Sequence, residues 1–442
     1  MPFIPVTPAQ QEAMFRVLGI TAIEDLFREL PEGLRFPELS LDEGVSELEV
    51  IRELSALAEQ NTPADTYRWF LGAGAYDHFI PAAVGALASR GEFTTAYTPY
   101  QSEVSQGTLQ SIFEYQSMIA ELTGMEVVNA GHYDGATALA EGVLMALKHN
   151  EARNRVLLPA GLHPEYRAVL DTYLGAFEPA IETYTGSPAA AASASASHDL
   201  ACLVSCYPDF FGYIPDLEGA AQAIHTQGAL FIVQGDPIML GLFKSPGSFG
   251  ADLVTAEGQS LGNELNYGGP FLGIMAASRE LMRRIPGRIV GEARDHEGRQ
   301  GYVLTLSARE QHIRREKAVS NICSNQGLAM LRACIYLALT GKQGLKTIGE
   351  LCWHKSHYAA AQIAALQGFQ VAEGIFFKEF LVTLPGNAEE AAERLFQNRI
   401  VPGLPLSRYY PERPKELLVC VTEKNTRADI DALVRGLKEL YR

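Results

Sequence analysis

Residues 251–273, ADLVTAEGQSLGNELNYGGPFLG, decide how this sequence is interpreted. The pattern predicts a buried strand at 253–256, a polar turn, a Gly-Gly-Pro break and a second apolar strand. Counting back from Pro270, Gln259 takes the position just after the first strand. Polar groups at strand ends of α/β sheets are where ligands bind. An amine there could bond covalently to an aldehyde, whereas an amide cannot.

Strands and helices alternate outward from this stretch, between residues 66 and about 325. Further buried strands are predicted at 155–158, 200–206, 229–233 and 271–276, and helices at 108–123, 133–148 and 217–225. This alternation predicts a mostly parallel sheet with helices on both faces. The Ala/Ser run at 188–197 predicts a loop or a weak helix.

The two ends of the chain have a different character. Residues 1–65 predict an N-terminal helical arm, with one helix after Thr7 and a second at 48–59. Residues 326–442 predict a small C-terminal α+β domain. Its elements are helices at 327–339 and from about 351, strands at 377–384 and 416–422, a helix capped by Asn387 and a last helix opened by Thr426. The expected domains are therefore the arm 1–65, a large α/β domain 66–325 and the small domain 326–442.

Composition limits the class of protein and its partners. The 442 residues are 47% hydrophobic and 20% charged, with a net charge of −16. That charge argues against nucleic acid or an anionic membrane as a general partner. The longest apolar runs are too short to span a membrane, and no secretory signal is visible, so we expect a cytoplasmic protein.

The six cysteines predict neither a disulfide nor a metal site. Cys202 and Cys206 share one face of a predicted strand and lie about 13 Å apart at its usual rise, too far to be bridged. No histidine lies nearby at ligand spacing, so we expect no metal. Buried free thiols are the simplest interpretation.

A polar, aromatic loop at 97–106 precedes the helix predicted at 108–123. It contains Tyr97, Tyr100, Gln101 and Gln106. Such side chains before a helix N-terminus could line a site for a small anionic or zwitterionic ligand. The alternative is a loop that only packs on another subunit.

Three other positions are candidates for chemistry. His132 precedes a Gly-Ala-Thr helix start that could hold a phosphate or could be an ordinary N-cap, and its ring could act in acid–base chemistry, stack on a ring or be structural. Asp236 ends a strand and could pair with a protonated ring nitrogen or be a turn residue. Arg315 belongs to a basic segment at 309–325 that could hold a carboxylate or phosphate, or be a solvated helix face.

Seven stretches taken together are more specific than any one of them. They are GAGAYDHFIP (72–81), AYTPYQSEVSQGTLQSIFEYQ (96–116), YDGATALAE (133–141), EGQSLGNELNYGGPFLG (257–273), PGRIVGE (286–292), LSAREQHIRREKAVSNIC (306–323) and YLALTGKQGL (336–345). Over nearly the whole chain they resemble the glycine cleavage system P-protein, and more narrowly the first subunit of its two-chain bacterial form. The resemblance implies a pyridoxal-phosphate-dependent transferase fold (aspartate aminotransferase-like, fold type I).

The resemblance also implies a function. In that family, glycine is decarboxylated on pyridoxal phosphate and the aminomethyl group passes to the lipoyl arm of H-protein. Subunit 2 carries the cofactor lysine in an Asn-Leu-His-Lys-Thr setting, where this chain has EGQSL at 257–261. We therefore expect no covalent cofactor on this chain, with Gln259 in the lysine's place, and pyridoxal phosphate on the partner subunit. Asp236 lies off the family's cofactor-aspartate register by a residue or more.

The resemblance further implies a heterotetramer with two copies of each subunit. This chain would complete the active site of subunit 2, and the candidates for contributions in trans are Tyr97, Tyr100, Gln101, His132 and Arg315. Two alternatives are a non-catalytic structural partner of subunit 2 and an independent pyridoxal phosphate enzyme. The rival lysine for the latter, Lys244, precedes the strand at 253–256 and so lies on the wrong side of the sheet edge.

Overall fold

The computed structural model describes residues 6–35, 40–95, 97–195, 197–318, 320–322 and 326–441. Contacts divide the chain into two units, Met1–Thr62 and Pro63–Arg442. The first unit contains helices α1 (Pro8–Leu18) and α2 (Glu47–Ala58), each opened by a capping box, at Thr7 and Ser46. Both helices predicted for the N-terminal arm are therefore present.

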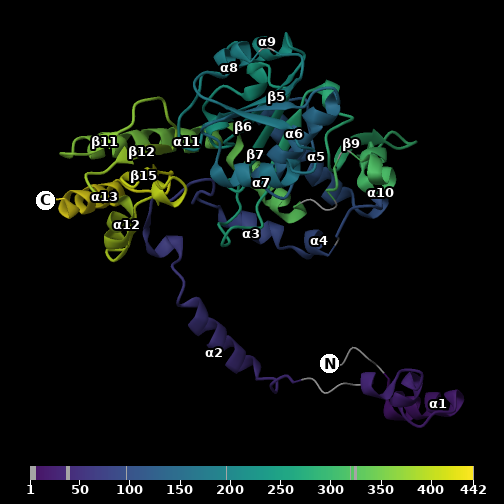
Figure 1. Ribbon diagram of the computed structural model, residues 1–442. Coiled ribbons are helices and arrows are strands. Elements are labelled where there is room, and N and C mark those ends of the chain that lie inside the picture. The colour runs from purple at the N-terminus through teal and green to yellow at the C-terminus, as the bar shows by residue number, and fades with distance from the viewer. Residues whose placement is uncertain are drawn as a thin grey trace. The chain divides into compact units, whose positions relative to one another are not determined.

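A seven-stranded sheet forms the centre of the second unit (Figure 1). In sheet order the strands are β2 (Val127–Val128), β8 (Gly273–Ala277), β7 (Leu253–Glu257), β6 (Leu230–Gly235), β5 (Leu200–Tyr207), β3 (Arg155–Pro159) and β4 (Ala180–Tyr184). Neighbours from β7 to β4 pair in parallel, whereas β8 is antiparallel to both β7 and β2. The prediction of a mostly parallel sheet is confirmed.

Alternate residues of each strand pack on opposite sides of this sheet, because side chains in a strand alternate in direction. On β5, Cys202 and Val204 pack in one apolar cluster with α6 (Gly135–His149) and α7 (Pro164–Leu174), whereas Leu203 packs in the other. The second cluster includes residues of α5 (Gln106–Thr123), α8 (Pro188–Ala194) and α9 (Ala220–His225). Helices thus cover both faces, as expected for buried parallel strands.

A smaller antiparallel sheet lies toward the C-terminus (Figure 1). Its strands in order are β11 (Gln370–Val371), β12 (Glu379–Thr383), β15 (Glu416–Cys420) and β14 (Leu404–Pro405). It packs with α12 (Ala388–Phe396), α13 (Arg427–Leu440) and the end of α11 (Gly327–Ala364) around a third apolar cluster. The predicted caps are present: Asn387 accepts two backbone N–H bonds, and Thr426 forms a capping box.

The long helix α11 differs from its sequence-based prediction. Two separate helices were expected, the second from about residue 351, but helical structure runs from 327 to 364 with a single break at Gly341. Gly341 has φ +57°, which a residue without Cβ adopts at little cost. Strand β4 was not predicted, because its residues are largely half-exposed or exposed, and neither was the hairpin of β9 (Ile289–Arg294) and β10 (Gln300–Thr305).

Besides short 3-10 helices, the remaining elements are α3 (Ala82–Ala88), α4 (Gly91–Thr94), α10 (Gln311–Arg314), and β1 (Arg68–Trp69), which pairs in parallel with β13 (Ile400–Val401). Five cysteines are free and buried, as predicted; Cys323 lies outside the described residues. Within the described ranges, no helix has the length and apolar character needed to cross a membrane.

Candidate functional site

Polar side chains collect where β6 and β7 end, at the carboxyl edge of the parallel sheet. We call Tyr76, Asp236, Glu257, Gln259 and Lys378 the strand-end site. Asp236 follows β6, Glu257 ends β7, and Gln259 lies two residues further on. A cavity of about 70 Å³ is lined by Asp236 and Glu257 together with Gly74, Tyr76, His163, Tyr166, Asp209 and Glu379. This is the edge at which α/β folds bind their ligands.

The Gln259 side chain is buried and fully hydrogen-bonded. Its Oε1 accepts from the Tyr76 backbone N–H at 2.8 Å, and its Nε2 donates to the carbonyls of Tyr76 at 3.1 Å and Asn263 at 2.8 Å. Only 2% of the residue is exposed. An amide is needed here because the position requires both an acceptor and donors, and an ammonium offers donors alone.

The N-terminus of α6 faces the end of β7, and two carboxyl groups occupy it. Glu257 Oε2 accepts from the N–H of Gly135, the first residue of α6, at 2.8 Å. Its Oε1 accepts from the N–H groups of Gln259 and Leu272. Asp134 is the N-cap, and its Oδ1 accepts from Thr137 N–H at 2.7 Å. Burial raises the pKa of Glu257 to about 8, against the three N–H groups that favour its charged form.

Asp236 is paired with a lysine from the small-sheet region. The Nζ of Lys378, the residue before β12, lies 2.7 Å from Asp236 Oδ2, and both side chains are almost completely buried. Asp236 Oδ1 accepts from Ile238 N–H at 2.9 Å. The ammonium also lies 3.4 Å from the centre of the Tyr76 ring, in cation–π contact. Although burial lowers it, the Asp236 carboxylate keeps the pKa of Lys378 above its ordinary value.

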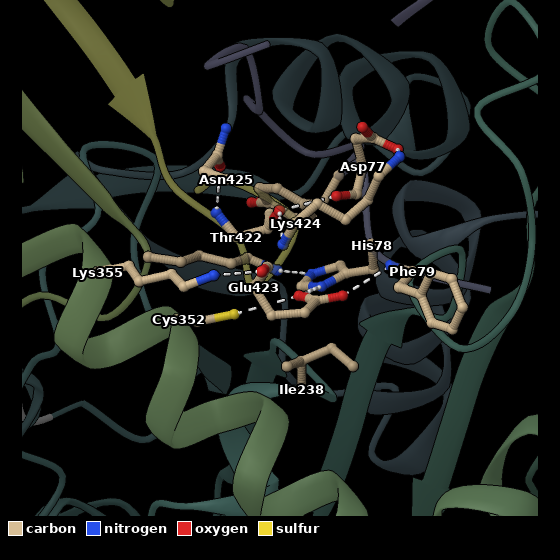
Figure 2. Close-up of polar contacts among 12 residues, drawn as sticks. Asp77, His78, Phe79, Ile238, Cys352, Lys355, Thr422, Glu423, Lys424 and Asn425 are labelled. Atoms are coloured by element: carbon tan, nitrogen blue, oxygen red, sulfur yellow. Dashed lines mark hydrogen bonds and ion pairs between the residues drawn. The ribbon is translucent and has the colours of Figure 1, made fainter. Parts of the chain in front are cut away.

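A second buried polar cluster lies around His78 and Glu423 (Figure 2), and its His78 ring contacts Lys378. Lys378 Nζ lies 3.1 Å from His78 Nε2, and His78 Nδ1 lies 2.6 Å from Glu423 Oε2. Figure 2 shows Cys352 and Lys355 converging on Glu423 from α11, where Lys355 donates to its backbone carbonyl. Although burial opposes it, the His78 ring lowers the pKa of Glu423 to about 2.

His78, Cys352 and Glu423 also lie close enough to share a metal ion, with ligand atoms within 4.8 Å of one another. However, an ammonium can only donate, so Lys378 requires the lone pair of His78 Nε2, and the ring proton then lies on Nδ1 facing Glu423. A metal ion on Nδ1 would displace this proton toward the ammonium. We therefore interpret the group as a hydrogen-bonded cluster.

The tyrosine loop, residues 97–106, lies elsewhere. Tyr97 and Tyr100 are 83% and 64% exposed, and Gln101 is also exposed. The Arg288 guanidinium lies 5.7 Å from the Tyr100 ring centre. Gln106 fixes the loop to β10, because its side chain exchanges two hydrogen bonds with the backbone of Tyr302. None of the loop's residues lines the cavity of the strand-end site.

The other predicted site residues are also dispersed. His132 is completely buried, its two ring nitrogens have no hydrogen-bond partner within the described parts of the chain, and burial lowers its pKa to about 3. Arg315 is exposed. Arg309 is used structurally, since its guanidinium donates to the carbonyls of Ile285 and Gly287. Lys244 pairs at the surface with Glu218, at 2.9 Å.

Sequence reasoning missed Tyr76, Glu257 as a ligand of the α6 N-terminus, and Lys378. One signal was present: Lys378 and Glu379 interrupt the apolar run 375–384, IFFKEFLVTL. Charged residues inside such a run are rarely buried without partners. Here the partner of Lys378 is Asp236, and Glu379 accepts from Tyr76 Oη at 2.7 Å.

A mostly parallel seven-stranded sheet with one reversed strand and helices on both faces has the fold of pyridoxal-phosphate-dependent enzymes of fold type I. Solved structures agree on this fold. A sphingosine-1-phosphate lyase from Burkholderia pseudomallei has a TM-score of 0.64 at 14% identity, covering 92% of this chain and 94% of its own. An alanine–glyoxylate aminotransferase from Nostoc has 0.59 at 16%, covering 93% and 100%. At these identities the likeness shows the fold alone.

The chain belongs to the glycine cleavage system P-protein family, whose family model matches residues 1–437. Probable glycine dehydrogenase (decarboxylating) subunit 1 from Desulforamulus reducens is 49% identical over 99% of both chains, and that from Thermomicrobium roseum is 47% identical over 99% of both. A crystal structure of glycine decarboxylase (P-protein) of the glycine cleavage system, in inhibitor-bound form, has a TM-score of 0.91 at 42% identity and covers 100% of each chain. The sequence-based resemblance and fold class are confirmed.

Proposed function

We propose that this chain, as subunit 1 of glycine dehydrogenase (decarboxylating), completes the active site of subunit 2 and holds no pyridoxal phosphate itself. The observation that carries the proposal is the buried Gln259 amide, hydrogen-bonded at both ends in the position expected for the lysine. The residues of the strand-end site do not fit the cofactor: position 259 offers no amine, the first N–H of α6 is already bonded to Glu257, and Asp236 is already paired with Lys378.

The reaction would then take place on the partner subunit. Pyridoxal phosphate bound there supplies the electron sink for decarboxylation of glycine, and the aminomethyl group is passed to the lipoyl group of H-protein. The role of this chain would be to orient the reactants and to exclude water, through groups at its surface. Tyr97, Tyr100 and Gln101 are exposed donors and acceptors on one anchored loop, which suits that part.

Arg315 could hold an anionic group, because its guanidinium is exposed and always charged. His132, the remaining candidate, differs from the others because it is completely buried, and burial lowers its pKa to about 3, so we propose only that it is neutral. The assembly we propose is a cytoplasmic heterotetramer of two copies of each subunit.

Purification of the full chain alone, and of the chain co-expressed with subunit 2, tests the proposal. We expect pyridoxal phosphate absorbance and glycine–CO₂ exchange only in the co-expressed complex, with one cofactor per pair of subunits. Covalent cofactor on the chain alone would contradict the assignment. A transient, salt-sensitive pair would contradict the heterotetramer.

The second candidate function is that of a purely structural partner of subunit 2. The polar groups of the strand-end site bond within this chain, which favours this function as much as a contribution to the active site of subunit 2. The two differ at the tyrosine loop. If this chain contributes groups in trans, removal of the Tyr97 or Tyr100 hydroxyl lowers activity and leaves assembly intact. A structural partner would show no change in activity.

A further inference from the structure

We infer that the chain's own side chains occupy the place of pyridoxal phosphate in the strand-end site: Lys378 stands in for the protonated ring nitrogen, and Glu257 for the phosphate. The site is therefore closed by two substitute side chains as well as by the absence of a lysine at position 259. This inference deepens the proposed function and rests on it for the assignment of the cofactor to the partner. Its test uses this chain without subunit 2 and without glycine, so the inference and the proposed function can fail separately.

The first substitution concerns the ring nitrogen. A strand-end aspartate binds the pyridinium N–H of the cofactor because the carboxylate stabilises the positive ring. Asp236 occupies such a position after β6, but its Oδ2 already faces the Lys378 ammonium at 2.7 Å, with 6% and 1% of the two residues exposed. The Tyr76 ring covers the ammonium at 3.4 Å from its centre. A pyridinium could reach Asp236 only by displacing a buried cation.

The second substitution concerns the phosphate. Free N–H groups and the helix dipole make a helix N-terminus a phosphate site. At the N-terminus of α6, Gly135 N–H donates to Glu257 and Thr137 N–H donates to Asp134. A Cβ at Gly135 would lie 2.4 Å from Tyr166 Oη and 2.9 Å from Glu257 N, so no space is left beside the backbone. A phosphate would meet two carboxyl groups in place of N–H donors.

A cavity remains beside these groups. The cavity beside these groups measures about 70 Å³. Asp236 and Glu257 both line it, so the two groups border the same cavity. Its lining includes the Asp209 carboxyl, and burial raises the pKa of this group to about 6.

The substitute ion pair has a structural consequence. Asp236 follows β6 of the large sheet, whereas Lys378 precedes β12 of the small sheet. The ion pair therefore ties the small sheet to the large one at the position where a cofactor would otherwise lie. Restoring a lysine at position 259 would leave this tie in place, and it would also leave the Tyr76 N–H without its acceptor.

Three forms of the full chain test the inference after incubation with pyridoxal phosphate: wild type, Gln259→Lys, and the triple variant Gln259→Lys/Lys378→Ala/Glu257→Ala. Borohydride reduction followed by mass spectrometry counts the pyridoxyl groups fixed at residue 259. We expect none in the wild type or in Gln259→Lys, and close to one per chain in the triple variant. A matched control, Gln259→Lys/Lys244→Ala, removes a surface lysine and should remain unlabelled.

Each outcome of the labelling experiment either supports or overturns the inference. Full labelling of Gln259→Lys alone overturns the inference, because the lysine would then be the only missing element. A triple variant that melts cooperatively and takes no label also overturns it, because other groups would exclude the cofactor.

If the triple variant does not fold, a double-mutant cycle replaces it. Lys378→Met and Asp236→Asn should each lower the melting temperature, and their combination should lower it less than the sum of the two shifts, because neither charge is left buried alone. Additive shifts overturn the inference.

Discussion

The strand-end site and the tyrosine loop are both rich in polar groups, yet they differ in where those groups bond. In the strand-end site, Gln259, Asp236 and Lys378 are buried, and each makes contacts within this chain. In the tyrosine loop, Tyr97 and Tyr100 are mostly exposed although Gln106 fixes the loop to β10. A loop that presents large aromatic side chains at the surface is suited to contact another molecule.

The difference shows which region can act on a partner's chemistry. A group whose hydrogen bonds are satisfied inside the chain contributes stability and has no free atom for a reaction. An exposed hydroxyl on an anchored loop contributes little stability and can meet a ligand or a second subunit. Substitutions in the strand-end site should therefore change folding, and those in the tyrosine loop should change activity.

The largest effect is expected for Lys378→Met. This change leaves the buried Asp236 carboxylate without its cation, so the free energy of unfolding should fall by about 3–5 kcal/mol. Urea unfolding followed by circular dichroism measures it. The control Lys244→Met removes a half-exposed surface ion pair and should cost at most about 1 kcal/mol. Equal losses for the two variants would remove the distinction between buried and exposed polar groups.

A smaller, pH-dependent effect is expected for Glu423→Gln. The pKa of Glu423 is about 2 in the folded chain against an ordinary value of 4.5, so its contribution to stability is present above pH 4.5 and is lost as the pH falls through 2. The variant should be less stable by about 1.5–3 kcal/mol at pH 7, the usual contribution of a hydrogen bond to a charged group. Melting temperatures of both forms from pH 7 to pH 4 measure the gap. It should be constant above pH 5 and narrow below pH 4.5; a gap that widens toward low pH would contradict the assigned role of Glu423.

The smallest effect in energy concerns the tyrosine loop. Tyr97→Phe or Tyr100→Phe should lower glycine–CO₂ exchange by the complex about tenfold, or about 1.4 kcal/mol of transition-state stabilisation. The subunits should still assemble, because the rings and their apolar contacts remain. Size-exclusion chromatography and exchange rates test this together. Full activity in both variants would make the loop only an interface element.

Much of this architecture could be predicted from local sequence patterns. Strands β3, β5, β6, β7 and β8 are short apolar runs between turn signals, and α5 and α6 carry a helical apolar period, so each was found near its true bounds. The edge strand β4 was missed because its largely half-exposed or exposed residues give no apolar run. The break in α11 was predicted to extend from about residue 340 to 350, but it is confined to Gly341, because a single glycine can adopt the required backbone conformation.

The sequence by itself determined the sheet class, the family and the absence of a lysine at position 259, because each can be recognised from short stretches of consecutive residues. Only the tertiary structure decided that Lys378 meets Asp236 and that Glu257 bonds to the first N–H of α6. These partners come from segments that local periodicity treats separately. They meet because the small sheet packs at the edge of the large one. A charge buried there is tolerated only when an opposite charge pairs with it, and the fold supplies that charge from a distant segment.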